Sequence, residues 1–523
     1  MGRLPSDRPV RVTFVRPPRH FWPIINESDN FLLPLGYPCL AAYLREHLPA
    51  VEVEILDCCV LKMGWRSLRA ELAAKRPDVV CIGELTMYHK EAFRAFRLAK
   101  ELLPDCVTVA GGYFFSALPE WSLEHCEALD FVVRQEGEET LRDLLATLRD
   151  GGDAAAVLGI HHRAGGAIAM TPPRPLIADL DSLPMPAYDI SHMEKYAPFG
   201  KLWPRAATIQ RSRGCTHDCD FCSWWVQEGQ HRLEDGNLVP MRHYRTKSAQ
   251  RVIAETELLY EKFGVRYLFW VDGTWNLDSA WLDEYCSEII RRGYKLGWWA
   301  FIRVDLLLQQ EKEGILEKMV QAGLRHVLVG IERNQDEDFK TLHKPGYTRD
   351  VVKEAFHLLA NKYPQVFRQG TILTGLRSDD AASIRGLLKY AHEINVDFPA
   401  FHALTPFPGT RLFQEAKEKG WIEDWDFENY DMFNPIMRTE HLDRQQVSQH
   451  TNWCYQNFVA RKPLRFFSRL LSPHGIRRRL HWWFLYAIGR TLLVDLWKSL
   501  KGEKRFEGFA ATSKMWKPDW YET

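Results

Sequence analysis

Three cysteines lie close together in the middle of this 523-residue chain, in the segment RSRGCTHDCDFC at residues 211–222. Cys215, Cys219 and Cys222 follow a β-like run and precede two tryptophans. A loop this short can turn all three sulfurs toward one point, and three thiolates at one point bind a metal ion or an iron–sulfur cluster. A cubane cluster held by three cysteines has one iron without a protein ligand, which can bind a substrate or a cofactor.

The alternative is a zinc site in which His217 or a distant thiol is the fourth ligand. Zinc motifs usually consist of two paired knuckles, and no second knuckle follows Cys222. His217 also stands between two of the cysteines, where its ring would have difficulty in reaching the same metal. The spacing therefore favours a cluster.

The C-x3-C-x2-C spacing resembles the signature of the radical S-adenosylmethionine (SAM) enzymes. The resemblance implies that the open iron binds the amino and carboxylate groups of SAM. It also implies that the reduced cluster cleaves SAM to a deoxyadenosyl radical.

The N-terminal region alternates strand-like and helical patterns. The alternation predicts an α/β domain with a parallel, doubly wound, Rossmann-like sheet. In such sheets ligands bind beyond the carboxyl ends of the strands. The strand-like runs are residues 10–15, 51–56, 79–83, 107–110 and 131–133.

Small and polar residues follow three of these strands and mark a candidate ligand edge. Paired glycines let a ligand approach the backbone closely, although alone they could simply form a turn. Such strand ends, directly upstream of the cysteine loop, resemble the cobalamin-binding domain of the cobalamin-dependent radical SAM enzymes. The resemblance implies that Thr86, Gly111 and Gly112 accommodate the nucleotide tail of cobalamin, and the further cofactor contacts that we expect are Tyr113, Glu136 and Gly137.

One motif of the cobalamin proteins is missing. Domains that ligate cobalt through histidine carry Asp-x-His-x-x-Gly after the first strand, whereas Pro18 and Pro23 stand here in place of the aspartate and the glycine. We therefore interpret His20 as an ordinary loop residue, not as a cobalt ligand. Many cobalamin-dependent radical SAM proteins lack this motif, so its absence does not argue against cobalamin.

A second βα series follows a proline-rich stretch. We expect a cobalamin domain at residues 1–165, a linker at 166–206 and a partial (β/α)6 barrel of the TIM type at 207–430. Active-site groups of such barrels lie at the carboxyl ends of the strands. The strand-like runs of this series are residues 207–210, 266–271, 297–303, 326–332, 367–373 and 397–404.

Charged residues end several of these apolar strands. In the family that the cysteine loop resembles, SAM is contacted from equivalent strand ends, and an aromatic residue before the third cysteine packs near the adenine. By this resemblance the SAM contacts are Phe221, Asp272, Arg303 and Glu332. Carboxylates suit the sulfonium charge and the ribose hydroxyls, and a cation suits the carboxylate of SAM.

The remaining segment, residues 431–523, shows no βα rhythm and is expected to be mostly helical. Basic residues flank an aromatic and aliphatic stretch at 477–497, a composition that an interfacial membrane helix requires. A helix packed on the barrel explains the apolar residues equally well and is the interpretation we favour. Nucleic acid is a weaker alternative, because the basic cluster is short and has no recognisable binding fold around it.

The composition indicates a folded protein of the cytoplasm. The eleven cysteines are an odd number, and several stand inside apolar runs, which is typical of free thiols in a reducing compartment. The chain opens without a signal peptide, and no apolar run is long enough to span a bilayer.

Three hypotheses about function follow. The first is a cobalamin-dependent radical SAM methyltransferase acting on an unactivated carbon, or a phosphinate phosphorus, of a small or lipophilic molecule. The second is an oxidative cyclase or rearrangement enzyme with the same cofactors, like the anaerobic magnesium-protoporphyrin ester cyclases that the chain resembles. The third is a non-catalytic, metal-stapled binding protein. The resemblance implies a 4Fe–4S cluster, SAM and cobalamin, an external electron donor such as flavodoxin or ferredoxin, and no nucleic acid; it identifies no catalytic residue.

Overall fold

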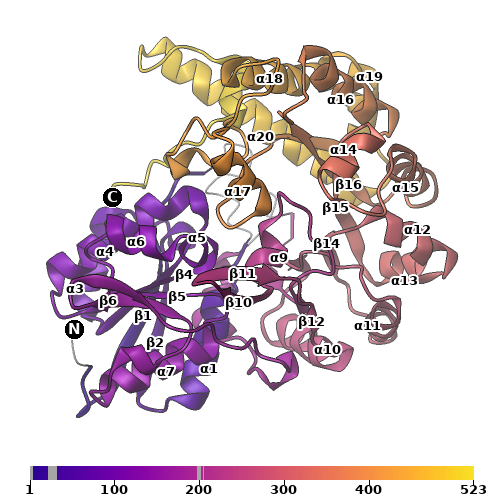
Figure 1. The fold of residues 1–523 in the computed structure, drawn as a ribbon. Coiled ribbons are helices and arrows are strands. Elements are labelled where there is room, and N and C mark those ends of the chain that lie inside the picture. Colours follow the sequence, from indigo (N-terminus) through magenta and orange to yellow (C-terminus); the bar gives the residue numbers. More distant parts are fainter. Residues whose placement is uncertain (1–3, 22–31, 197–201, 204) are drawn as a thin grey trace.

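Two α/β bodies lie side by side, and a helical C-terminal segment lies along the second (Figure 1). The computed structural model describes residues 4–21, 32–196, 202–203 and 205–523. Pro23, which stands in place of the glycine of the cobalt-ligand motif, and part of the expected linker 166–206 lie outside these residues. Among the residues that the structure describes, no helix combines the length and the apolar composition that crossing a membrane requires.

The first body is built on a seven-stranded sheet in the order β2-β1-β3-β4-β5-β6-β7. Strands β1 to β5 are parallel, which confirms the predicted doubly wound sheet, whereas β6 and β7 are antiparallel additions that we had not predicted. The strands are β1 Val10–Arg16, β2 Val51–Asp57, β3 Val79–Gly83, β4 Val107–Gly111, β5 Phe131–Val133, β6 Ile160–Ala164 and β7 Ala167–Met170.

Alternate residues of the buried strands face two helical layers. Along β3, Val79 and Cys81 pack toward α1 and α7, while Val80 and Ile82 pack toward α3 and α4. A strand covered on both faces must be apolar throughout, which explains the continuous apolar runs of the sequence. The helices are α1 Gly36–His47, α2 Cys58–Leu61, α3 Trp65–Lys75, α4 His89–Leu102, α5 Gly112–Ala117, α6 Pro119–His125 and α7 Glu138–Arg149.

The second body is an all-parallel, six-stranded sheet in the order β17-β16-β15-β14-β13-β8, as predicted for a partial barrel. Its strands are β8 Ala206–Ile209, β13 Tyr267–Trp270, β14 Gly297–Phe301, β15 Leu324–Glu332, β16 Phe367–Thr374 and β17 Phe398–Ala403. Its helices are α9 Ser223–Gln227, α10 Ala249–Glu257, α11 Ser279–Arg291, α12 Val304–Lys312, α13 Ile315–Ala322, α14 Asp336–Thr341, α15 Arg349–Lys362, α16 Ala381–Glu393 and α17 Arg411–Glu418.

Two small antiparallel pairs interrupt the βα order between β8 and α10. Strands β10 Gln230–Glu234 and β11 Asn237–Met241 form a hairpin, and β9 Ser212–Arg213 pairs with β12 Arg245–Thr246. Asp235 and Gly236 join the hairpin strands, and both have positive φ. An Asp-Gly turn with two positive φ angles is a strong hairpin signal, so this element was available in the sequence and we missed it.

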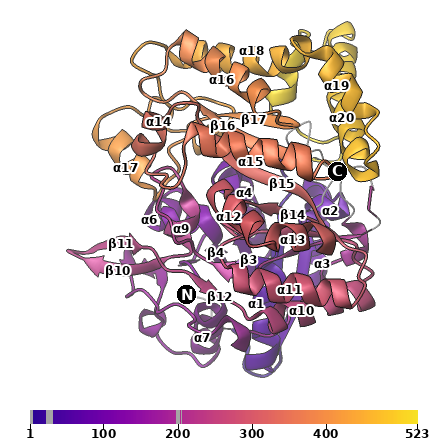
Figure 2. The ribbon, with the colours of Figure 1, turned by 90° about the vertical axis from the view of Figure 1, so that its right-hand side faces the viewer.

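Three helices form the C-terminal segment: α18 Arg444–Ala460, α19 Pro463–Leu470 and α20 Gly475–Leu500. Helix α18 packs along α16 and β17. Helices α19 and α20 lie at the end of the barrel where its strands begin, and Figure 2 shows them at the outer edge of the molecule. Phe484 of α20 stacks on Phe398 and Phe367, with ring centroids 4.2 and 5.5 Å apart. The barrel therefore buries one face of α20, as predicted for a helix that packs on it.

A buried carboxylate fastens the same helices. Asp397, next to β17, accepts hydrogen bonds from Arg368 of β16 (2.9 Å) and Arg477 of α20 (2.6 Å). Burial alone would raise the pKa of Asp397, but these guanidinium groups and Arg469 of α19 together hold it well below its usual range. Asp397 therefore joins α19 and α20 to the barrel through ion pairs.

The last residues of the chain return to the first body. Trp65 and Ser67 of α3 donate their backbone N–H groups to the carbonyls of Tyr521 (3.1 Å) and Thr523 (2.9 Å). Trp516 forms an isolated β-bridge with Phe21, in the loop after β1. Figure 1 accordingly shows the C-terminus beside the first body, so the chain ends against the edge where the loop after β1 emerges.

Candidate cofactor site

The cysteine loop leaves the carboxyl end of β8 and is held from several sides. Gly214, with φ +83°, opens the loop, and any Cβ there would lie 1.8 Å from the carbonyl oxygen of His243. Trp225 Nε1 donates to the Cys219 carbonyl (3.0 Å), and Leu412 N donates to the Asp220 carbonyl (3.0 Å). The loop is thus bound to α9 and to the start of α17, which fixes the direction of its thiols.

The three thiols are enclosed and close enough to influence one another. Cys215 and Cys219 are buried and Cys222 is half-buried. Burial, with the nearby Cys219 and Cys215, raises the pKa of Cys222 to about 12. Because iron and zinc bind thiolates, these protons must leave when a metal centre is assembled.

The spread of the sulfurs separates a cluster from a single zinc ion. Among the residues that the structure describes, the ligand atoms of His20, Glu91 and Glu428 all lie within 4.8 Å of one another. The sulfurs of the three cysteines do not form such a group. Sulfurs around one tetrahedral zinc lie only about 3.8 Å apart. Nδ1 of His217 lies 3.0 Å from Thr216 Oγ1 and 4.0 Å from Cys215 Sγ, so this nitrogen is engaged within the loop. The donor set fits an iron–sulfur cluster.

Two of the four predicted SAM contacts gather at one rim of the barrel. Glu332, at the end of β15, pairs with Lys344 Nζ at 2.6 Å, and its backbone has φ +57°. Arg303, after β14, pairs with Asp305 at 2.7 Å. Arg303 and Lys344 both lie over the Tyr347 ring, 4.8 and 4.2 Å from its centroid. Lys344 lies in a loop without any strand-end signal, and sequence reasoning missed it.

Asp272 lies deeper than a ligand contact requires. Its Oδ1 accepts hydrogen bonds from Ser212 N and Ser212 Oγ, both at 2.6 Å, and from Arg211 N at 3.1 Å, so it braces the backbone that leads into the cysteine loop. Burial raises the pKa of Asp272 to about 6. Its Oδ2 is buried without a hydrogen-bond partner, which leaves one acceptor beside the loop. Phe221 is partly buried against a core cluster that the first body and the barrel share.

The turns after β3 and β4 pack backbone against backbone. Gly112 has φ +81°, and a Cβ there would lie 3.0 Å from Glu84 N. Glu84 N donates to the Gly111 carbonyl (3.3 Å), and Phe114 N donates to the Glu84 carbonyl (3.3 Å). Thr86 follows at the start of the short helix η2 Thr86–Tyr88 and is buried. The glycines let the two turns pack closely at the edge where we expect cobalamin, and we call this edge the cradle.

A hydrogen-bonded bridge joins this cradle to the cysteine loop. Tyr113 donates its hydroxyl to Glu228 Oε1 (2.9 Å), and Glu228 Oε2 accepts from Gly214 N (2.8 Å). Burial raises the pKa of Glu228 to about 7. Glu228 stands after α9, away from any strand end, so the sequence carried no signal for it. The bridge therefore places the strand ends of the first body next to those of the second.

Glu136 belongs to a second bridge between the bodies. Its carboxylate accepts from Arg213 (2.6 Å), Arg245 (2.9 Å) and Ile177 N (2.8 Å), so protein donors occupy both oxygens. Against the effect of burial, Arg213 and Arg245 hold the pKa of Glu136 below its usual range. Gly137 precedes α7, where a Cβ would lie 3.0 Å from Leu40 Cδ2.

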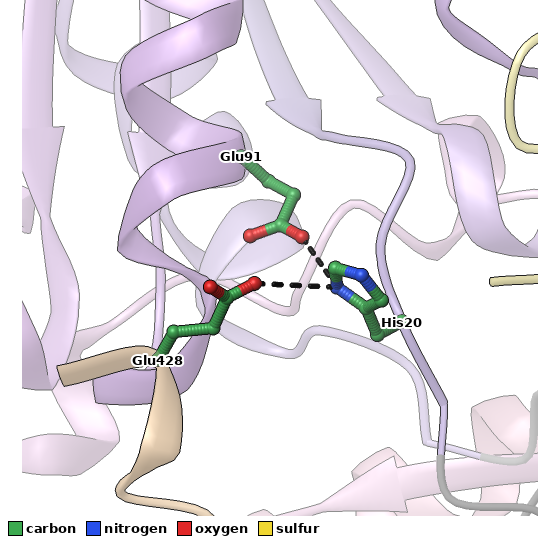
Figure 3. A group of neighbouring side chains, drawn as sticks. All are labelled: His20, Glu91 and Glu428. Carbon is green, nitrogen blue, oxygen red and sulfur yellow. Dashed lines mark ion pairs between the residues drawn. The ribbon is translucent and has the colours of Figure 1, made fainter. Parts of the chain in front are cut away.

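His20, in the loop after β1, faces two carboxylates (Figure 3). Its Nδ1 lies 2.7 Å from Glu91 Oε1 of α4 and 4.0 Å from Glu428 Oε1. Glu91 is buried, and Glu428 also binds Lys90 at 2.7 Å. One ring nitrogen of His20 is therefore engaged by protein.

Each of the two bodies matches a known protein family. Residues 22–145 match the B12 binding domain, and residues 209–391 match the Radical SAM superfamily. An uncharacterized methyltransferase of Pyrococcus horikoshii is 27% identical over 449 residues, 84% of this chain and 91% of the relative. The anaerobic magnesium-protoporphyrin IX monomethyl ester cyclase of Rubrivivax gelatinosus is 29% identical over 434 residues, 81% of this chain and 74% of the relative.

A solved structure has the same fold along nearly the whole chain. The radical S-adenosylmethionine methyltransferase TsrM from Kitasatospora setae, with cobalamin and a 4Fe–4S cluster bound, superposes with a TM-score of 0.66 at 17% identity, covering 92% of this chain and 99% of that one. The two family matches give the cofactors: cobalamin for the first body, and a 4Fe–4S cluster and SAM for the barrel. An N-terminal cobalamin domain joined to a SAM-cleaving barrel places the chain among the B12-binding radical SAM enzymes.

Proposed function

We propose that this enzyme transfers a methyl group to an unactivated carbon, or a phosphinate phosphorus, of a small or lipophilic molecule. The observation that carries the proposal is the Tyr113–Glu228–Gly214 bridge, which ties the cobalamin cradle to the cysteine loop. A substrate held between the two edges would be within reach of both cofactors, as a reaction that removes a hydrogen atom and then adds a methyl group requires. The methyltransferase of Pyrococcus horikoshii, similar over 84% of the chain, supports the same reaction class.

Each of the three cofactors has its own set of candidate binding residues. Cys215, Cys219 and Cys222 would hold the cluster. Arg303, Lys344 and Glu332 offer both charges of a zwitterionic amino acid group, which suits the methionine moiety of SAM. Thr86, Gly111 and Gly112 would hold the cobalamin tail. When bound, the cluster and SAM supply a radical that removes a substrate hydrogen atom, and the corrinoid supplies the methyl group.

Aromatic side chains of the two bodies meet next to the cysteine loop. Trp224 of α9 lies with its ring centroid 6.3 Å from Tyr113 and 5.6 Å from Phe301 of β14. A Cβ at Gly273 would meet the Trp224 side chain at 3.4 Å, so the barrel rim is close to this ring. Such a wall favours an apolar substrate and keeps water from a radical intermediate. We propose in addition that an external donor such as flavodoxin or ferredoxin reduces the cluster.

A second candidate is an oxidative cyclisation or rearrangement without methyl transfer. The similarity to the Rubrivivax gelatinosus cyclase over 81% of the chain favours it, because both reactions use the same cofactors. Membership of the radical SAM enzymes removes the third hypothesis, a non-catalytic metal-stapled protein.

The products of SAM distinguish the two reactions. With methyl-deuterated SAM and a substrate that turns over, methylation is expected to yield S-adenosylhomocysteine and deoxyadenosine in equal amounts per product, with deuterium in the product. Cyclisation yields deoxyadenosine, or none net if SAM is regenerated, and no label transfer. Mass spectrometry of the product decides: turnover that leaves the label outside the product refutes methylation and supports the cyclase.

The lower face of the cobalt gives an independent prediction. Because the histidine motif is absent and Nδ1 of His20 is engaged by Glu91, we expect bound cobalamin to have neither its own base nor a histidine on cobalt. Paramagnetic resonance of the cob(II) form should lack axial-nitrogen superhyperfine splitting. The spectrum of His20→Ala should be the same as that of the wild type. Nitrogen splitting that disappears in His20→Ala would assign the ligand to His20.

A further inference from the structure

Helix α20 carries two apolar faces on opposite sides. Leu480, Phe484 and Ala487 form a buried stripe against the barrel. A second stripe, at 482, 486, 493, 497 and 500, repeats with helical spacing on the opposite side, because these positions fall within about 60° around the axis at 100° per residue. Its members are exposed by 51 to 74%: Trp482, Tyr486, Leu493, Trp497 and Leu500. We call these five residues the outer stripe.

The outer stripe continues onto the neighbouring helix. Leu464, Phe467 and Leu471, in and next to α19, are exposed by 84, 53 and 79%. Trp482 Nε1 donates to the Leu470 carbonyl (3.1 Å), which fixes the end of α19 against α20. From 482 to 500 the stripe is about 27 Å long at 1.5 Å per residue. An apolar surface of this extent on a folded protein indicates a binding face.

The charges around the outer stripe are almost all positive. The acidic residues of segment 461–505 are Asp495 and Glu503, and Asp495 is buried and pairs with Lys504. Besides Arg477, which pairs with Asp397, the exposed or half-buried basic residues of the same segment are Arg461, Lys462, Arg465, Arg478, Arg479, Arg490, Lys498, Lys501, Lys504 and Arg505. The partner of this face must therefore combine apolar groups with negative charge.

A depression in the outer stripe is lined by apolar atoms. Its volume is about 410 Å³, and its lining is formed by Tyr486, Gly489, Arg490, Leu493, Val494 and Trp497. Aromatic and aliphatic walls of this kind suit an acyl chain.

We propose that the outer stripe and its basic rim dock on an anionic lipid bilayer, with α20 lying in the plane of the interface. Aromatic and leucine residues on one side with lysine and arginine beside them are the composition of an interfacial helix. A second copy of the chain fits less well, because a two-fold pairing of this face would oppose basic residues with basic residues.

Docking in this orientation leaves the cofactor edge free. The buried face of α20 covers the strand starts, since Leu480, Trp483 and Phe484 pack with Ala206, Tyr267 and Phe367. The cysteine loop lies at the opposite, carboxyl ends of the strands. The bilayer would therefore contact the side of the barrel opposite the cofactor edge. Docking then requires neither turnover nor bound cofactor.

Vesicle flotation of the full-length protein tests the proposal. Vesicles of phosphatidylcholine mixed with phosphatidylglycerol should bind the wild type at least about tenfold better than phosphatidylcholine alone, and high salt should weaken the binding. Leu493→Glu combined with Trp497→Glu should abolish it, because the carboxylates are repelled by the lipid and cannot enter its apolar layer.

Matched controls place glutamate on other exposed apolar residues. Leu233 of the β10–β11 hairpin is 48% exposed and Trp425 is 52% exposed, so Leu233→Glu and Trp425→Glu should bind vesicles as the wild type does. Circular dichroism verifies that each variant is folded. The proposal is overturned if the wild type binds no anionic vesicles, if neutral vesicles bind it equally, or if the double variant still binds. A dimer that dissociates in the double variant, without lipid binding, would assign the face to a second copy.

Discussion

Replacing Cys215, Cys219 or Cys222 by alanine will remove the iron–sulfur cluster and with it all SAM cleavage. Each thiol is one of three protein ligands, and the other described cysteines lie in the packed cores or apart from this loop. Anaerobic reconstitution with iron and sulfide should give the wild type about four iron atoms per chain and a broad charge-transfer absorption shoulder. Each variant should retain almost no iron and release no deoxyadenosine.

A buried thiol elsewhere is the matched control. Cys286 of α11 is fully buried in the barrel's helical layer, and burial raises the pKa of its thiol far above the usual range. Cys286→Ala should therefore keep iron, absorbance and SAM cleavage, with a modest loss of stability from the small cavity. Wild-type protein that takes up one zinc and no iron under these conditions would falsify the cluster assignment.

Gly112→Ala will weaken cobalamin binding. Gly112 has φ +81°, and the new Cβ would stand 3.0 Å from Glu84 N. A left-handed conformation costs a residue with a side chain about 1–2 kcal/mol, and relieving the contact displaces the turn that leads from Glu84 to Thr86. If binding must restore that turn, a cost of this size weakens it about tenfold. Cobalamin retained after gel filtration, read from its visible absorption, should fall accordingly.

Gly166→Ala is the control that separates the cost of backbone strain from the effect of the steric contact at Glu84. Gly166, in the turn between β6 and β7, has φ +89° but open space around its Cβ position. The substitution carries the same backbone cost in the same sheet, so thermal stability should fall similarly while cobalamin content stays at the wild-type level. Equal cobalamin content in Gly112→Ala and the wild type would mean that the turn after β4 is not part of the cradle.

Local patterns account for most of the fold. The largely apolar runs predicted the parallel strands of both sheets, because a strand buried on both faces has few positions for a polar side chain. The added strands β6 and β7 were missed, and the hairpin was missed although Asp235 and Gly236 announce its turn. Strand ends indicated the ligand edge for a topological reason: parallel strands deliver their carboxyl ends to the same side.

The sequence by itself determined the chemistry of the cysteine loop, since three thiols within eight consecutive positions, 215–222, cannot be far apart however the rest folds. It also determined the order of the two α/β bodies. Only the tertiary structure decided which side chains complete the site. Tyr113 and Glu228 meet across 115 positions of sequence, and Lys344 reaches Glu332 from an irregular loop. It also decided which apolar face of α20 is buried, because helical periodicity gives two stripes and only the position of the barrel selects between them.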